Sequence, residues 1–148
     1  MIYGNGIDIQ EIRKIQKAQE KRESFAKRIL TVNELAIFEK YKGNRKYEFL
    51  AGRFSAKEAF SKAYGTGIGK KVGFQDIEIL NDSQTGRPEI VKFPGDNKLQ
   101  AKISISHSGE YVVTEVILEK LTWQTKMKKF LIHSFPTRRS SDLRKSVV

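Results

Sequence analysis

The feature that most constrains the fold of this chain is the order in which two patterns of apolar residues occur. Helical spacing of apolar residues dominates the first half, and alternation of apolar and polar residues dominates the second half. After a short predicted strand at residues 2–9, helical spacing predicts helices that cover residues 11–28, 31–43 and 45–64. In the second half, alternation predicts strands that cover residues 74–80, 89–93, 102–107 and 111–118. Helices and strands that are segregated along a chain indicate an α+β fold rather than a parallel α/β sheet. We expect the last two strands to form a hairpin.

Local signals predict where these elements begin, end and approach one another. Thr31-Val-Asn-Glu34 is a capping box, in which the Thr31 hydroxyl caps the amide three residues on and Glu34 reaches back. Gly65 is expected to end the long helix. Gly4 and Gly6 in the first strand predict close backbone packing there.

The composition excludes several kinds of site. The chain has no cysteine, which rules out disulfides, thiolate metal ligands and a cysteine nucleophile. Its two histidines argue against a multi-histidine zinc site. No apolar run approaches the roughly 20 residues that cross a membrane, and residues 1–10 lack the features of a secretory signal. We therefore expect a cytoplasmic protein without a membrane partner.

A net charge of +11 suggests an anionic partner, but the charge is unevenly distributed. Residues 1–118 contain 20 basic and 15 acidic side chains, whereas residues 119–148 contain 8 basic and 2 acidic ones. We assign residues 1–118 to one domain. We interpret residues 119–148 as a basic tail that is non-native or disordered, because residues 135–143 resemble translated vector sequence.

The predicted helix at residues 45–64 has two different sides. At about 100° per residue, Phe49, Ala56 and Phe60 fall on one side, which we expect to be buried. Glu58 and Lys62 fall on the opposite side, one turn apart. Taken alone, they predict an ordinary solvated ion pair.

Other residues suggest chemistry around that pair. Asp8 lies near the end of the first strand and could share a cation with Glu58, since Mg²⁺ takes one or two protein carboxylates together with water and substrate phosphates. Lys62 could then meet a phosphate or a leaving oxygen. The glycine-rich segment 65–69 could let backbone amides approach an anion, although a helix end explains Gly65 by itself. Neither a P-loop nor a dinucleotide-binding fingerprint is present.

Three pieces of sequence occur together, in order: Asp8, the block RFSAKEAFSKAYGTGI at residues 53–68, and Ser106-His107-Ser108. Together they resemble the holo-acyl-carrier-protein synthases, the small bacterial group of 4′-phosphopantetheinyl transferases, across residues 1–118. The resemblance implies an α+β 4′-phosphopantetheinyl transferase fold. It also implies transfer of 4′-phosphopantetheine from coenzyme A to a serine of apo acyl carrier protein, in fatty acid biosynthesis. Members of this group assemble as homotrimers with active sites at subunit interfaces.

The same resemblance implies roles for individual residues. Asp8 and Glu58 would bind Mg²⁺, Glu58 would also help to deprotonate the serine, and Lys62 would stabilise the departing phosphate. His107 would act near the phosphates as a third catalytic residue. The residues expected around coenzyme A are Arg45, Arg53, Lys57, Ser61, Lys62, Gly65, Thr66, Pro88 and His107. Of these, Arg45 and Arg53 are expected at the 3′-phosphate, supplied by a neighbouring subunit.

The resemblance also gives the first predicted helix a partner, because acyl carrier proteins are acidic and a positive helical face would orient them. The residues expected at that contact are Arg13, Lys14, Lys17, Lys21, Arg22 and Arg28, with Phe25 as an apolar anchor. Relatives often carry arginine where Lys14 and Lys21 stand. Lysine makes a point contact rather than a bidentate one, so we expect these substitutions to affect the affinity for a given carrier rather than the reaction.

Three alternatives stay open. A basic nucleic-acid-binding protein would explain the charge, but the acids mixed among the bases of residues 1–118 and the lack of a known signature argue against specific nucleic-acid binding. A binding module that has lost catalysis would keep the fold, although Asp8, Glu58, Lys62 and His107 are all present. A transferase that acts on another carrier, such as a peptidyl carrier domain, is the third. The short chain favours the stand-alone synthase.

Overall fold

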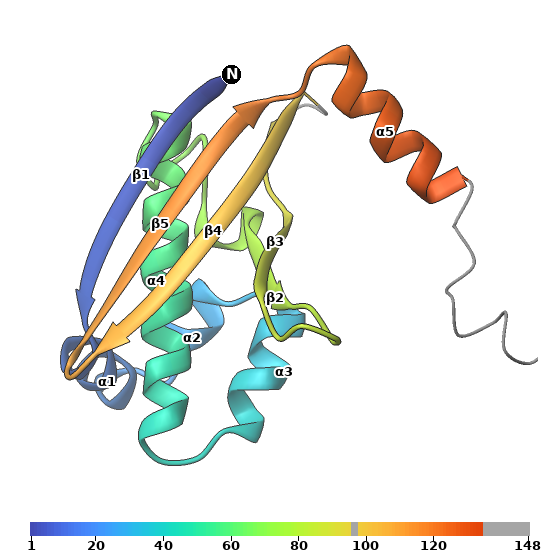
Figure 1. The fold of residues 1–148 in the computed structure, drawn as a ribbon. Helices are drawn as coiled ribbons and strands as arrows, with labels where there is room; N and C mark the ends of the chain where they lie inside the picture. Colours follow the sequence, from blue (N-terminus) through green and yellow to red (C-terminus); the bar gives the residue numbers. More distant parts are fainter. Residues whose placement is uncertain (96–97, 135–148) are drawn as a thin grey trace, which may run out of the picture.

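The fold is organised around one long helix that lies against a three-stranded sheet (Figure 1). The computed structural model describes residues 1–95 and 98–134. The sheet is antiparallel, in the order β1 (Ile2–Glu11), β5 (Tyr111–Lys120), β4 (Leu99–Ser108). The helix α4 (Asn44–Tyr64) packs on β1 and β5, and Gly65 ends it in the left-handed conformation with φ 93°. The predicted α+β architecture, the hairpin of the last two strands and the helix end at Gly65 are confirmed.

Three short helices precede α4 and gather near one end of it: α1 (Ile12–Lys21), α2 (Ser24–Ile29) and α3 (Val32–Lys40) (Figure 1). The prediction of one continuous helix over residues 11–28 is wrong, because Arg22 leaves the helical conformation. The Gln19 side chain stabilises this break, since its amide oxygen accepts a hydrogen bond from the Ala26 amide at 2.8 Å and its NH₂ donates to the Glu23 carbonyl. The capping box at Thr31 and Glu34 is confirmed, and it begins α3.

A second, two-stranded sheet lies beside β4. It consists of β2 (Glu78–Asn81) and β3 (Pro88–Lys92), and a 3₁₀ turn, η1 (Phe74–Asp76), precedes it. The predicted strand over residues 74–80 is therefore wrong in its first half. The reason is local, because the Asp76 carboxylate accepts a hydrogen bond from the Gly73 amide at 2.8 Å and closes a tight turn.

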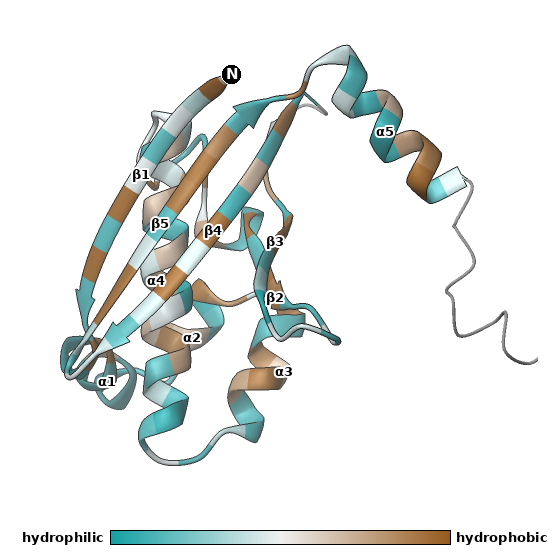
Figure 2. Ribbon diagram, in the orientation of Figure 1, coloured by the Kyte–Doolittle hydropathy of each residue, from teal (hydrophilic) through white to brown (hydrophobic). Residues whose placement is uncertain are grey.

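Two clusters of buried apolar side chains hold these layers together, and α4 contributes to both. One joins Phe60 to the sheets, and the other joins Leu50 to the three short helices. Figure 2 shows hydrophobic and hydrophilic residues alternating along β4 and β5, as expected for strands with one covered face.

The first strand packs on α4 without side chains between the two backbones. A Cβ atom at Gly4 would overlap the backbone of Ala63, and a Cβ at Gly6 would overlap the Ala59 carbonyl oxygen. The close packing predicted from these glycines is confirmed. It places the residue two positions beyond Gly6 directly beside the helix.

The chain continues past the predicted domain boundary at residue 118. β5 runs to Lys120, and α5 (Trp123–Ser134) then projects away from the rest of the molecule (Figure 1). Thr122 caps α5, since its hydroxyl oxygen accepts a hydrogen bond from the Thr125 amide at 3.2 Å. The described part of the predicted tail is therefore helical rather than irregular, whereas residues 135–148 lie outside the described residues. Among the described residues no helix combines the length and apolar character that a bilayer span requires.

Candidate active site

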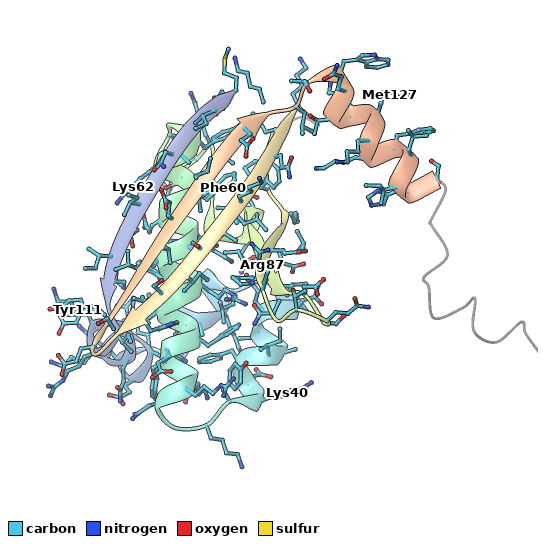
Figure 3. All side chains as sticks on the ribbon, viewed as in Figure 1. Lys40, Phe60, Lys62, Arg87, Tyr111 and Met127 are labelled. Carbon is cyan, nitrogen blue, oxygen red and sulfur yellow. The ribbon has the colours of Figure 1, made fainter. Side chains whose placement is uncertain are left out.

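The structure brings Asp8, Glu58 and Lys62 together where β1 lies on α4. The Lys62 ammonium is 3.1 Å from Asp8 Oδ1 and 3.0 Å from the Ile7 carbonyl oxygen, to which it donates. The predicted ion pair of Lys62 with Glu58 is therefore replaced by a pair between helix and strand. Figure 3 marks Lys62 on the side of α4 that faces β1.

Glu58 lies in an environment that disfavours its charge. Partial burial raises the pKa of the Glu58 carboxyl, the Asp8 carboxylate raises this pKa further, and the Lys62 ammonium opposes both effects. A carboxyl group with a raised pKa beside a second carboxylate is typical of a functional site.

The two carboxylates fit a divalent cation. Asp8 Oδ1 accepts from Lys62, whereas Asp8 Oδ2 is buried and has no hydrogen-bond partner among the described residues. A buried carboxylate oxygen without a partner is destabilising unless something binds it. In the part of the chain that the structure describes, no group of three or more His, Cys, Asp or Glu side chains gathers as a metal site. The donor set therefore suits Mg²⁺, which completes its shell with water and substrate oxygens.

The end of α4 supplies Ser61, Gly65 and Thr66 next to this pair. The Ser61 hydroxyl donates to the Glu58 carbonyl at 2.7 Å. The amides of Gly65, Thr66 and Gly67 all donate to the Ser61 carbonyl oxygen at 3.0 to 3.2 Å. These amides close the helix, so the expectation that they are free to meet an anion is not met at these three positions.

A second group of predicted residues lines a different pocket of about 280 Å³. Its lining includes Arg45, Arg53, Pro88 and His107. Arg53 is almost fully buried, and its guanidinium donates to the Ile79 carbonyl at 3.1 Å and to Asn81 Oδ1 at 3.0 Å. Burial lowers the pKa of Arg53, and the charge of Glu34 opposes that shift.

Aromatic rings support both arginines of this pocket. The Arg53 guanidinium lies 4.5 Å from the Phe49 ring centroid, and that of Arg45 lies 5.0 Å from the Tyr41 ring centroid. Sequence reasoning missed Tyr41 and Asn81 as lining residues. The available signal for Asn81 was its place directly after the predicted strand at residues 74–80.

Within one chain the two groups of residues are separate. Arg53 and Lys62 are nine residues apart on α4, which places them about 180° apart around the helix. Asp8 pairs with Thr114, which pairs with Ile105 on the far strand, so Asp8 and the β4 residue His107 lie on opposite edges of the sheet. Two strand spacings amount to about 10 Å. Within one subunit the two groups therefore face different sides of α4 and lie on opposite edges of the sheet.

The structure does not place Lys57 at either group. Its side chain is completely buried, and its ammonium donates to the Ile29 carbonyl at 2.7 Å and to Glu34 Oε1 at 2.6 Å. The expectation that Lys57 contacts coenzyme A is corrected accordingly.

The predicted carrier-binding residues form an exposed basic face on two helices rather than one. Four of them lie on α1 and are exposed: Arg13, Lys14, Lys17 and Lys21. Arg22, which follows the end of α1, and Arg28 on α2 are exposed as well. Phe25 is only half-exposed, because its ring packs against Phe54 with centroids 6.0 Å apart. Part of the Phe25 side chain, the predicted apolar anchor, therefore packs in the core.

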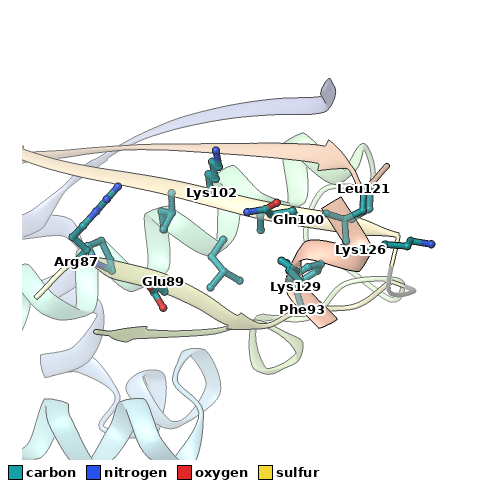
Figure 4. A pocket seen from close by; sticks show the side chains of 13 residues that line it. Arg87, Glu89, Phe93, Gln100, Lys102, Leu121, Lys126 and Lys129 are labelled. Carbon is teal, nitrogen blue, oxygen red and sulfur yellow. The ribbon is translucent and has the colours of Figure 1, made fainter. Parts of the chain in front are cut away.

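A larger groove of about 870 Å³ lies between β3, β4 and α5 (Figure 4). Its lining combines apolar side chains, among them Ile90, Phe93 and Ile103, with the basic side chains of Lys102, Lys126 and Lys129. It shares Pro88 with the smaller pocket. Sequence reasoning gave no indication of this groove.

Comparison with known proteins agrees with this geometry. Residues 4–116 match the family model described as the 4′-phosphopantetheinyl transferase superfamily. A holo-[acyl-carrier-protein] synthase of Ligilactobacillus salivarius is 99% identical over 132 residues, which are 89% of this chain and 98% of that protein. One from Streptococcus equi subsp. zooepidemicus is 57% identical over 121 residues, which are 82% of this chain and 99% of that protein.

Solved structures agree as well. A holo-(acyl-carrier-protein) synthase from Bacillus anthracis, in complex with CoA (3′,5′-ADP), has a TM-score of 0.74 and 49% identity, covering 82% of this chain and 99% of that one. The Helicobacter pylori enzyme in complex with coenzyme A has a TM-score of 0.66 and 31% identity, covering 78% and 99%.

The chain therefore belongs to the 4′-phosphopantetheinyl transferase superfamily. Within that superfamily it groups with the holo-[acyl-carrier-protein] synthases, which it matches along nearly their whole length. The family resemblance identified from residues 1–118 is confirmed.

The match to the Ligilactobacillus salivarius protein extends into the predicted C-terminal tail. A match of 132 residues in a chain of 148 leaves 16 residues outside it, so it includes residues 17–132 wherever it begins. The first part of the predicted basic tail is thus shared with the relative. The boundary at residue 118, and the interpretation of the remaining tail as non-native, stay predictions.

Proposed function

We propose that this chain transfers 4′-phosphopantetheine from coenzyme A to a serine of apo acyl carrier protein, releasing adenosine 3′,5′-bisphosphate. The observation that carries the proposal is the meeting of Asp8, Glu58 and Lys62, with one unpartnered carboxylate oxygen, in a chain of this family. The pathway that uses the product is fatty acid biosynthesis, and the reaction takes place in the cytoplasm.

Each residue of the Asp8 group has a part in the reaction. Asp8 and Glu58 would hold Mg²⁺, and the bound ion would neutralise charge on the diphosphate of coenzyme A. Glu58 accepts the proton of the attacking serine as the general base. The serine oxygen forms a bond to the β-phosphorus, and the bond from that phosphorus to the bridging oxygen breaks. Lys62 stabilises the departing oxygen and can protonate it.

The second group binds the nucleotide end of coenzyme A. Arg45 and Arg53 carry the positive charge that a 3′-phosphate requires, and aromatic rings orient both guanidinium groups. His107 and Pro88 complete this pocket. Because the Asp8 group lies on the other side of α4, a complete site needs the first group of one subunit and the second group of another.

A homotrimer satisfies this requirement, since a head-to-tail interface of cyclic symmetry brings two different surfaces of the same chain together at each contact. The outer face of the sheet offers apolar surface for such assembly. Ile7, Ile9 and Val113 are 57%, 62% and 39% exposed on adjacent strands. Exposed apolar side chains gathered on one sheet face are typical of an interaction surface.

The experiment uses the full chain with coenzyme A, Mg²⁺ and apo acyl carrier protein, and follows the carrier by intact-mass spectrometry. We expect one phosphopantetheine to be added per carrier. The matched control is Glu58→Gln, which keeps the size of the side chain and should lose transfer by at least about 100-fold, because a general base contributes about that much. A carrier of unchanged mass would contradict the proposal. Preferential labelling of a peptidyl carrier domain would show that the proposed transferase uses a carrier other than acyl carrier protein.

A further inference from the structure

A fully buried ion pair lies away from both groups of the candidate site. Glu34 of α3 and Lys57 of α4 are 0% exposed, and Lys57 Nζ is 2.6 Å from Glu34 Oε1. The same carboxylate accepts hydrogen bonds from the Thr31 amide at 2.8 Å and the Ile79 amide at 2.9 Å. A buried ion pair is often no more stable than apolar residues of the same volume, so stability alone does not explain it.

The Glu34 carboxylate of this pair binds the backbone at one edge of β2. Within residues 1–95 and 98–134, β3 is the one strand that pairs with β2, so the backbone groups on the other edge of β2 need partners from elsewhere. At Ile79 both are bonded by side chains. Glu34 accepts from the amide, and Arg53 Nε donates to the carbonyl at 3.1 Å. The strand is thereby held between a carboxylate of α3 and a guanidinium of α4.

Arg53 connects this anchor to the pocket. Its Nη2 donates to Asn81, two residues further along β2, while its guanidinium covers the Phe49 ring. Arg53, Asn81 and Pro88 all line the pocket of about 280 Å³. If β2 moved relative to α4, the direction of the guanidinium and the place of Asn81 and Pro88 would change together.

We propose that Glu34 and Lys57 are positioning residues for the phosphate-binding pocket. Lys57 fixes the Glu34 carboxylate, Glu34 fixes β2, and β2 fixes Arg53 and Asn81 in the orientation that receives an anionic group of coenzyme A. The inference rests on the proposed function, because it assumes that this pocket takes the nucleotide end of coenzyme A. Neither residue touches the substrate.

The test replaces the pair by apolar residues of similar size, Glu34→Leu with Lys57→Met, in the full chain. Such a replacement removes two buried charges together, so the protein is expected to stay folded. We expect the KM for coenzyme A to rise about tenfold, with kcat and the KM for the carrier within about twofold, because the change weakens binding of one substrate. Leu118→Ala is the matched control, since Leu118 is also fully buried but lies in the other apolar cluster. It should lower the unfolding temperature and leave the KM for coenzyme A unchanged.

A wild-type KM for coenzyme A in the folded double variant overturns the inference and leaves a purely structural pair. If the double variant does not fold, Thr31→Ala replaces it. This change removes the hydroxyl that accepts from the Glu34 amide, and should raise the same KM about threefold. An unchanged KM in Thr31→Ala then overturns the inference. Failure of the proposed function is distinguishable, because the unmodified chain would transfer nothing.

Discussion

At the scale of single residues, the two oxygens of Asp8 have different surroundings. One accepts from Lys62, and the other is buried with no hydrogen-bond partner in the part of the chain that the structure describes. Lys62 therefore keeps a position next to the carboxylates while one oxygen stays available for a cation. Glu58, whose pKa is raised by burial and by Asp8, is the group whose protonation state this arrangement controls.

The raised pKa of Glu58 predicts how stability depends on pH in the absence of Mg²⁺. Folded protein binds this proton more tightly than unfolded protein, so the Glu58 contribution falls as pH rises from about 4.3, the usual value for glutamate, through the higher folded-state pKa. Glu58→Gln cannot ionise, so this variant does not lose that stability as the pH rises. We expect this variant to be more stable than the unmodified chain at pH 7 and to lose its advantage below about pH 4. Urea unfolding at both pH values measures this, and an equal difference at both would contradict it.

Sequence identified Asp8, Glu58 and Lys62 but not their pairing. Spacing along one helix suggested Glu58 as the partner of Lys62, because a helical period says nothing of a strand that arrives from 54 residues away. Lys57 was placed at the substrate for a similar reason. Its position in the motif was visible, whereas the buried partner Glu34 lies on another helix.

At the scale of elements, the contact between β1 and α4 sets the distance between Asp8 and the helix. Gly6 permits this contact, since a Cβ there would overlap the Ala59 carbonyl oxygen. We expect Gly6→Ala to destabilise the fold by about 3 kcal/mol, because the backbone must shift to make room. Gly69→Ala is the control. A Cβ there meets nothing within 4 Å, and its effect should stay within about 0.5 kcal/mol. Chemical denaturation of both variants provides the comparison, and equal losses would be inconsistent with the packing argument.

The exposed basic face of α1 predicts a kinetic effect specific to the carrier. Reversing the charge of Lys14 and Lys17 should raise the KM for acyl carrier protein about tenfold and reduce its dependence on salt, because surface charges act mainly on association. The KM for coenzyme A should not change. Lys92→Glu is the control, because Lys92 is exposed and lies on β3, away from α1 in the sequence. A carrier KM that stays the same at low ionic strength would rule out this face as the docking surface.

The elements themselves were largely predictable, and the misses have local causes. The capping box at Thr31 and the glycine at 65 marked two helix ends because each signal lies within a few residues. The break between α1 and α2 depends on a hydrogen bond from Ala26 to Gln19, seven residues back, which periodicity does not register.

At the scale of the whole molecule, the separation of the two residue groups predicts complementation between inactive variants. Asp8→Asn impairs the first group and His107→Ala the second, so each variant alone should be inactive. In trimers formed from an equal mixture, about one interface in four joins an intact first group to an intact second group. Refolding the two variants together should therefore restore about a quarter of the activity, as measured by carrier mass. Lack of any recovery in mixed trimers would show that each subunit works alone.

The assembly and the C-terminal segment mark the limit of what one sequence can tell. Composition gave no sign of the proposed assembly, because apolar strand residues such as Ile7 and Ile9 could equally have been core residues. α5 was missed because its apolar and basic residues follow no sustained period, although Thr122 caps the helix.

The edge of β2 has one more consequence. An open strand edge is a template with which a strand of another chain can pair. At Ile79, Glu34 and Arg53 occupy the backbone groups that such a strand would need. Losing the hydrogen bond between Glu34 and the Ile79 amide should thus promote fibrils or precipitates at high protein concentration, under conditions in which the native fold persists.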